Sequence, residues 1–142
     1  MVVTPTPADG KHMRTIVNID VPELAPAIDF YSTALDVELS RIIETDVAEL
    51  TGTSSVIYLL ANASGSAATS AIAEVRRYSR HWTPVHIDFV VEDLLEATIR
   101  AIEAGASQES DCVEWRGSKC ITFSDPFGHG FCLIEFIGET YC

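Results

Sequence analysis

The stretch HIDFVVEDLLEATIRAIEAG, residues 86–105, decides the fold. Its first six residues alternate with a period of two, which places three apolar side chains on one face of a predicted strand: Ile87, Phe89 and Val91. His86 and Asp88 lie on the opposite face. Apolar residues then recur at helical spacing from Leu94 to Ile102, and Gly105 is a natural helix stop. The stretch therefore predicts a strand with one packed face, followed by a helix that covers that face.

The same pattern occurs 70 residues earlier, in IVNIDVPELAPAIDFYSTAL, residues 16–35. At this offset Val21 matches Val91 and Leu24 matches Leu94, while Asn18 takes the position of Asp88. Few residues are identical, so the shared periodicity is the stronger argument. Two copies of one strand–helix unit in a short chain indicate an internal duplication.

The rest of the chain supplies further strands to each copy. Strands are predicted at 36–45, 47–51 and 54–60 in the first copy, and at 111–116, 119–124 and 130–136 in the second. Gly117 marks a hairpin, and DPFG at 125–128 marks a turn. The prediction is an α+β fold of two βαβββ modules, residues 13–60 and 82–137. A linker at 61–81, with room for a short helix, separates the two modules. A flexible leader at 1–12 precedes the first module, and a tail at 138–142 follows the second.

Composition excludes several classes of partner. The chain has 142 residues, with 9 basic and 21 acidic side chains and a formal net charge of −12. Such a charge repels nucleic acid and anionic membranes and attracts cationic small molecules. No apolar run reaches the roughly 20 residues needed to span a bilayer, and no signal peptide opens the chain, so a cytoplasmic location is expected. The four cysteines form no CxxC pair and are expected to be reduced.

Three motifs carry a resemblance to a known family: FYSTAL after the first strand, HIDFVVEDL in the second copy, and the closing DPFGHGFCLIEF. Together they resemble the vicinal oxygen chelate superfamily, which includes glyoxalase I, extradiol dioxygenases, fosfomycin-resistance enzymes and bleomycin-resistance proteins. The resemblance implies a glyoxalase-like fold, in which the sheets of two βαβββ modules curl around a cleft. It also implies that a short member such as this one forms a homodimer, often with the cleft between subunits.

The resemblance further implies four positions at which metal-dependent members hold a divalent ion. In this chain they are occupied by Ile16, Tyr58, His86 and Cys132. Only His86 is a good ligand, and isoleucine has no lone pair to donate. The prediction is that no confident metal site exists and that purified protein carries well under one equivalent of metal. A divalent metal stays open as the alternative cofactor.

The predicted cleft face carries the candidate ligand-binding residues: Asn18, Tyr58, His86, Asp88, Trp115 and Cys132. His86 is the candidate catalytic residue, because imidazole can act as a general acid or base near neutral pH. Each of these residues can also be explained by packing or solvation alone. Cys132 near His86 raises the further alternative of a thiolate nucleophile. His129 is expected to be exposed in its turn.

These observations favour a protein that binds a small molecule. The acidic net charge indicates that this molecule is cationic. The protein would act by sequestration or by metal-independent chemistry. A metal-dependent lyase, isomerase or dioxygenase with an altered ligand set is the alternative. A pocket with only a regulatory or interaction role is a third.

Overall fold

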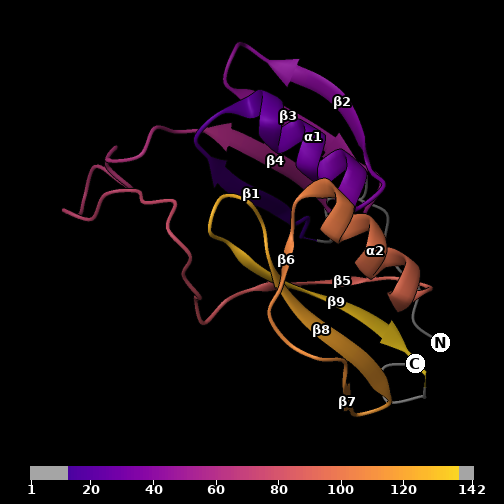
Figure 1. The fold of residues 1–142 in the computed structure, drawn as a ribbon. Coiled ribbons are helices and arrows are strands. Elements are labelled where there is room, and N and C mark those ends of the chain that lie inside the picture. The colour runs from indigo at the N-terminus through magenta and orange to yellow at the C-terminus, as the bar shows by residue number, and fades with distance from the viewer. Residues whose placement is uncertain (1–12, 138–142) are drawn as a thin grey trace.

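A computed structural model describes residues 13–137 and shows two mixed sheets, each accompanied by one helix (Figure 1). The predicted leader and tail lie outside the described residues. The first sheet has the order β1-β4-β3-β2 and the second the order β5-β9-β8-β6, with β7 also paired to β8. The predicted α+β fold is confirmed.

The first module contains four strands and one helix: β1 (Ile16–Val21), α1 (Leu24–Ala34), β2 (Glu38–Ile43), β3 (Val47–Thr51) and β4 (Val56–Ala61). β1 lies parallel to β4, and the remaining pairs are antiparallel. β2 is shorter than the predicted strand at 36–45, because Asp36 and Glu44 both adopt positive φ angles of 54° and lie in turns on either side of it.

The second module has one more strand than expected: β5 (Ile87–Val90), α2 (Leu94–Ala104), β6 (Ser107–Gln108), β7 (Val113–Trp115), β8 (Ser118–Ser124) and β9 (Gly130–Phe136). The segment between α2 and β8 pairs with β8 twice, and the irregular backbone between the two pairings separates β6 from β7. The hairpin at Gly117 is confirmed. Arg116 and Gly117 have φ angles of 45° and 77°, as a two-residue hairpin turn requires.

The period-two pattern of β1 places its side chains as predicted. Ile19 and Val21 are buried, whereas Ile16 and Asn18 are exposed on the other face. Both helices pack on the buried faces of their sheets and lie side by side in Figure 1. Arg100 of α2 donates to the carbonyl of Ala34 at the end of α1, 3.4 Å away. The two modules therefore share one core and join through their helices.

The DPFG turn is attached to this core by a buried carboxylate. Asp125 accepts hydrogen bonds from the backbone N–H groups of Phe127 at 2.8 Å and His129 at 2.9 Å, and also from the hydroxyl of Tyr31 in α1. Burial, followed by the adjacent Asp125 charge, raises the pKa of Tyr31 well above its usual value. The neutral phenol thus serves as a permanent donor that joins the two halves of the chain.

The linker forms no helix, so the short helix predicted there is wrong. Its backbone groups instead pair across a loop, Gly65 N to Arg76 O and Arg76 N to Ser66 O, both at 2.8 Å. Figure 1 shows this segment extending away from both sheets. Within residues 13–137, no helix has the length and apolar character needed to cross a membrane.

Candidate functional site

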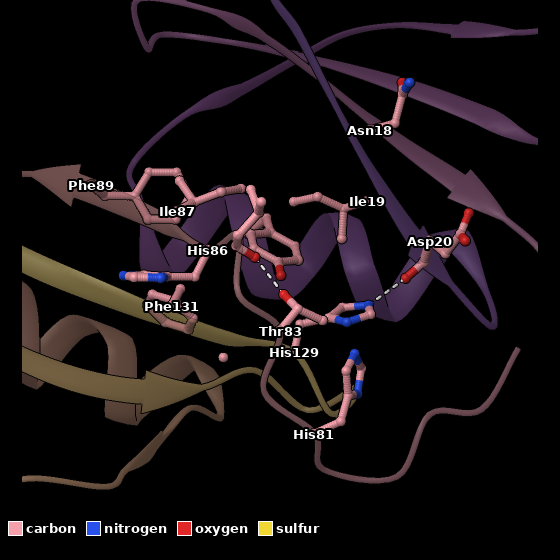
Figure 2. A pocket seen from close by; sticks show the side chains of 13 residues that line it. Asn18, Ile19, Asp20, His81, Thr83, His86, Ile87, Phe89, His129 and Phe131 are labelled. Atoms are coloured by element: carbon pink, nitrogen blue, oxygen red, sulfur yellow. Dashed lines mark hydrogen bonds between the residues drawn. The ribbon is translucent and has the colours of Figure 1, made fainter.

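A cavity of about 270 Å³ lies at the seam where β1 approaches the segment leading into β5 (Figure 2). Its floor is apolar and includes Ile19, Ile87 and Phe131. Polar side chains from both modules complete the lining: Asn18, Asp20, Tyr31, His81, Thr83, His86 and His129. An apolar surface with a few convergent polar groups is the usual composition of a small-molecule site.

Two histidines form the polar wall of the cavity. The ring of His129, in the turn before β9, has Nε2 2.6 Å from the carbonyl oxygen of Asp20, so that nitrogen carries the proton and donates. His81 packs edge-on against His129, with ring centroids 5.3 Å apart, and its Nδ1 lies 3.0 Å from the carbonyl of Ser79. Each ring is thereby held by one nitrogen, which leaves its other nitrogen for different contacts.

The negative charge of the Asp20 carboxylate, at the rim of this cavity, is paired with donors from the linker. Arg76 Nε donates to one oxygen and Asn62 Nδ2 to the other, both at 2.8 Å. Tyr78 donates to the carbonyl of Asn62 at 2.6 Å. This network fixes the start of the linker and its end against β1, beside the cavity.

A second group of side chains lies on the outer face of the second sheet. Asp88 and Cys132 are partners in the register of β5 and β9, and His86 precedes Asp88 by two residues. The Nε2 atom of His86 is 3.2 Å from Oδ1 of Asp88, and the three potential ligand atoms lie within 4.8 Å of one another. The ring of Trp82 packs against that of His86, with centroids 4.7 Å apart.

The thiols on this face are not activated as nucleophiles. Burial raises the pKa of Cys132, and burial together with the Cys132 thiol raises the pKa of Cys120 to about 12. A nucleophilic cysteine needs the opposite shift, because the thiolate is the reactive form. The raised pKa values therefore disfavour the alternative in which Cys132 attacks as a thiolate.

The candidate residues fall into separate groups. Asn18 and His86 line the seam cavity, while Asp88 and Cys132 lie beside His86 outside its lining. Tyr58 lies on β4, next to Glu49 in the sheet register. Arg41, bound to Glu49 at 3.2 Å, is the main cause that lowers the pKa of Glu49, with a smaller contribution from Tyr58. Trp115 ends β7.

The four metal positions that the resemblance implies do not fit a metal ion. Ile16 is exposed on β1 and has no donor atom. Among residues 13–137, the only group of three or more histidine, cysteine or acidic ligands within reach of one ion contains His86, Asp88 and Cys132, and no residue of the first module. A centre of the implied type, with ligands from both modules, is therefore absent from the described part of the chain.

Sequence reasoning overlooked part of the cavity. His129 was expected to be exposed, but it is half-buried against Asp20, 109 positions away in the chain. His81 stood at the end of the predicted linker, Thr83 near the start of the predicted second module, and Tyr31 in a predicted core helix. Only the short stretch 79–83, polar except for Trp82 and lying shortly before β5, indicated these residues in the sequence, and it resembles an ordinary loop.

Comparison with known proteins supports the fold. The family model of the glyoxalase-like domain matches residues 16–134. Among solved structures, the fosfomycin resistance protein FosX from Listeria monocytogenes is 17% identical, with a TM-score of 0.66, and the match covers 87% of this chain and 93% of that one. A glyoxalase/bleomycin resistance protein/dioxygenase superfamily member from Sphaerobacter thermophilus is 22% identical, also with a TM-score of 0.66. The match covers 87% of this chain and 97% of that one.

A glyoxalase/bleomycin resistance protein/dioxygenase from Nocardioides is 19% identical with a TM-score of 0.63, and this match covers all of the present chain and 91% of the other. No curated protein sequence matches significantly. Identities at this level establish the fold alone. Because the family model matches residues 16–134, nearly the whole chain and both of its sheets, the chain belongs to the glyoxalase-like domain family.

Proposed function

We propose that this protein binds a small organic molecule in the seam cavity, without the four-ligand metal centre that the vicinal oxygen chelate resemblance implies. The observation that carries the proposal is the cavity of about 270 Å³, lined by residues of both modules. Its volume is near the lower end of ligand pockets, which begin at roughly 300 Å³. The cavity therefore suits a compact ligand or one part of a larger ligand.

The preference for a cationic ligand rests on the charge of the whole chain. A formal net charge of −12 concentrates cations around the protein and repels anions. Sequestration of a basic compound, as in bleomycin resistance, fits this field better than capture of an anion such as fosfomycin. Salt should weaken such binding, because the attraction is screened over about 10 Å at 0.1 M ionic strength.

Metal-independent chemistry in this cavity would depend on His86. Its Nε2 atom is 3.2 Å from the Asp88 carboxylate, so the ring is oriented by an acidic partner, as in many general bases. Asp88 can stabilise the imidazolium that forms when His86 takes a proton from a bound molecule. His86 is therefore the proposed catalytic residue if the bound molecule is also transformed.

The experiment is a ligand-observed NMR screen of the full-length chain against fragments divided among amines, carboxylic acids and neutral compounds, with bleomycin and fosfomycin included. Amines and bleomycin should give most of the hits. Asn18→Ala and His86→Ala should remove these hits, whereas Asp29→Asn, an exposed carboxylate on α1, should keep them. A screen without hits, or hits that survive both cavity substitutions, would refute the proposal.

A metal-dependent lyase, isomerase or dioxygenase is the second candidate function. One observation favours it, namely the proximity of His86, Asp88 and Cys132 on the second sheet. A protein of this kind would lose its activity after exhaustive chelation and regain it with one added ion per chain. The sequestration proposal expects ligand binding to be insensitive to chelation.

A homodimer and a cytoplasmic location remain part of the proposal. Among residues 13–137, β2 is an edge strand that pairs only with β3, and it is exposed on both faces. Its apolar residues Leu39 and Ile42 are 41% and 48% exposed. An edge with free backbone groups and exposed apolar side chains is suited to pairing with a second copy.

A further inference from the structure

The outward face of α2 is apolar, although it faces solvent. Leu95, Ile99 and Ile102 are 72%, 51% and 47% exposed, and their i, i+4, i+7 spacing places them in one row along the helix. The buried face of α2 consists of different side chains: Leu94, Ala97, Thr98 and Ala101. The core of the second module therefore does not contain the three exposed residues, which we call the α2 stripe.

The first module shows that these helix positions can be small or polar. α1 and α2 have equal lengths and lie 70 residues apart, so the α2 stripe corresponds to three residues of α1: Ala25, Asp29 and Ser32. Both helices pack on their sheets through the opposite face. Because the same unit forms in the first module without apolar residues at these positions, the fold does not explain the α2 stripe. A row of exposed apolar side chains is typical of an interaction surface.

Two hollows flank the α2 stripe, and Leu95 lies between them. One, of about 400 Å³, lies between α2 and the end of α1, and its lining includes Ile99 and Thr33. The other, of about 360 Å³, lies between α2 and the strands β6, β8 and β9, and its lining includes Thr98 and Ile121. The surface is thus a ridge with a groove on each side, which is the shape that interlocks with the side chains of another helix.

The rim of the two grooves is acidic. Its cationic side chains are Arg100 and Lys119, and each already faces a carboxylate, Arg100 that of Glu96 at 3.6 Å and Lys119 that of Glu135 at 3.9 Å. The grooves contain three further carboxylates: Asp93, Glu103 and Asp111. The rim therefore carries an excess of negative charge, in a chain whose formal net charge is −12.

We propose that the α2 stripe is the docking surface for a basic amphipathic helix of another protein. Apolar side chains of this helix pack on Leu95 and Ile99, and its lysine or arginine side chains face the acidic rim. A second copy of this chain is a less suitable occupant, because pairing two α2 stripes brings two acidic rims together. Anionic membranes are disfavoured by the same repulsion.

The proposed surface is separate from the other sites. It shares no lining residue with the seam cavity, and it belongs to the second module, whereas the edge strand β2 belongs to the first. Binding at the α2 stripe can therefore be measured without a ligand in the cavity.

The test is fluorescence anisotropy of the full-length chain with three labelled peptides of about 18 residues, or five helical turns. The first is an amphipathic helix of leucine and lysine. The second has the same residues reordered to alternate as in a strand, and the third has glutamate in place of lysine. We expect saturable binding of one leucine–lysine helix per chain, weakened by salt, and at least about tenfold weaker binding of the other two peptides.

The matched variant gives α2 the exposed residues of α1 by combining Leu95→Ala, Ile99→Asp and Ile102→Ser. It should bind the leucine–lysine helix at least about tenfold more weakly, although the introduced aspartate attracts lysine, so the loss reports on apolar contacts. All three positions are exposed, so the variant is expected to fold, which circular dichroism checks. Leu95→Ala alone should weaken binding about threefold and serves if the combined variant does not fold.

Two further variants are controls for the composition of the surface. Ile72→Ser removes an exposed isoleucine from the linker, and Glu38→Gln removes an exposed carboxylate from β2. Both should bind the leucine–lysine helix as wild type does, whereas Glu103→Gln on the rim should bind it roughly twofold more weakly.

Three results would overturn the proposal. The first is the absence of saturable binding by wild type, or equal binding by wild type and the folded α2 variants. The second is a lower molecular mass of the combined variant in light scattering, which would assign the α2 stripe to contact between copies. The third is co-sedimentation of wild type, but not of the combined variant, with phosphatidylserine vesicles, which would assign the α2 stripe to a membrane.

Discussion

At the scale of single residues, the contact between Tyr31 and Asp125 has the largest structural consequence. The two residues are 94 positions apart, both are buried, and Tyr31 donates to a carboxylate that also holds the turn before β9. Tyr31→Phe leaves one buried carboxylate oxygen without this donor. The expected loss in the free energy of unfolding is about 1–3 kcal/mol at neutral pH, measured by urea denaturation.

The same residue predicts how stability depends on pH. The pKa of Tyr31 is raised in the folded state, so the folded protein holds this proton more tightly than the unfolded chain does. Its contribution is complete below the unfolded pKa of about 10 and is lost as the pH rises toward the folded value. Tyr31→Phe should therefore lose less stability above about pH 10 than wild type. Tyr58→Phe, on the half-buried sheet face, is the control that should retain the wild-type profile.

At the scale of elements, the DPFG turn and the segment before β5 are fitted closely together. A β-carbon on Gly128 would lie 2.5 Å from the carbonyl oxygen of Ser79 and 2.7 Å from that of Tyr78, and Gly128 has a φ of 91°. His81 N donates to the Gly128 carbonyl at 3.0 Å. This contact positions His81 and His129 together on the cavity wall.

Gly65 allows steric fit to be separated from backbone strain. Its φ is 86°, but a β-carbon there would meet nothing within 4 Å. Gly65→Ala should cost about 1–2 kcal/mol through its left-handed backbone alone. Gly128→Ala should cost more, because the backbone at 78–79 must also move. Thermal unfolding of the two variants side by side checks this, and equal costs would show that the close approach is unimportant.

At the scale of the whole molecule, we expect a homodimer. The edge strand β2 carries the exposed apolar side chains of Leu39 and Ile42, and a second copy is the simplest partner for such a surface. Light scattering at micromolar concentration should give twice the chain mass. Ile42→Glu should shift the mass to that of a monomer without loss of helix and strand content, whereas Glu38→Gln on the same strand should not. A monomer mass for wild type would contradict the prediction.

The sequence alone determined the two strand–helix units and which of their faces are buried. Alternation in β1 and β5 and the helical spacing of α1 and α2 are local patterns, because each side chain's face follows from its own backbone period. The duplication then predicted two similar units, and the structure shows two mixed sheets, each with one helix. Linker residues 61–81 lacked such a period, and the short helix suggested there did not form.

Only the tertiary structure decided how the sites are assembled. His129 contacts Asp20, and Tyr31 donates a hydrogen bond to Asp125. Asp88 lies beside Cys132. Each contact forms because strands and turns that are distant in the sequence pack into one core. No local pattern fixes a contact between residues 40 or more positions apart, since it depends on how whole modules pack. The sequence could therefore place His86 and Asp88 on one face of a strand. The seam cavity and the three-ligand group required the fold itself.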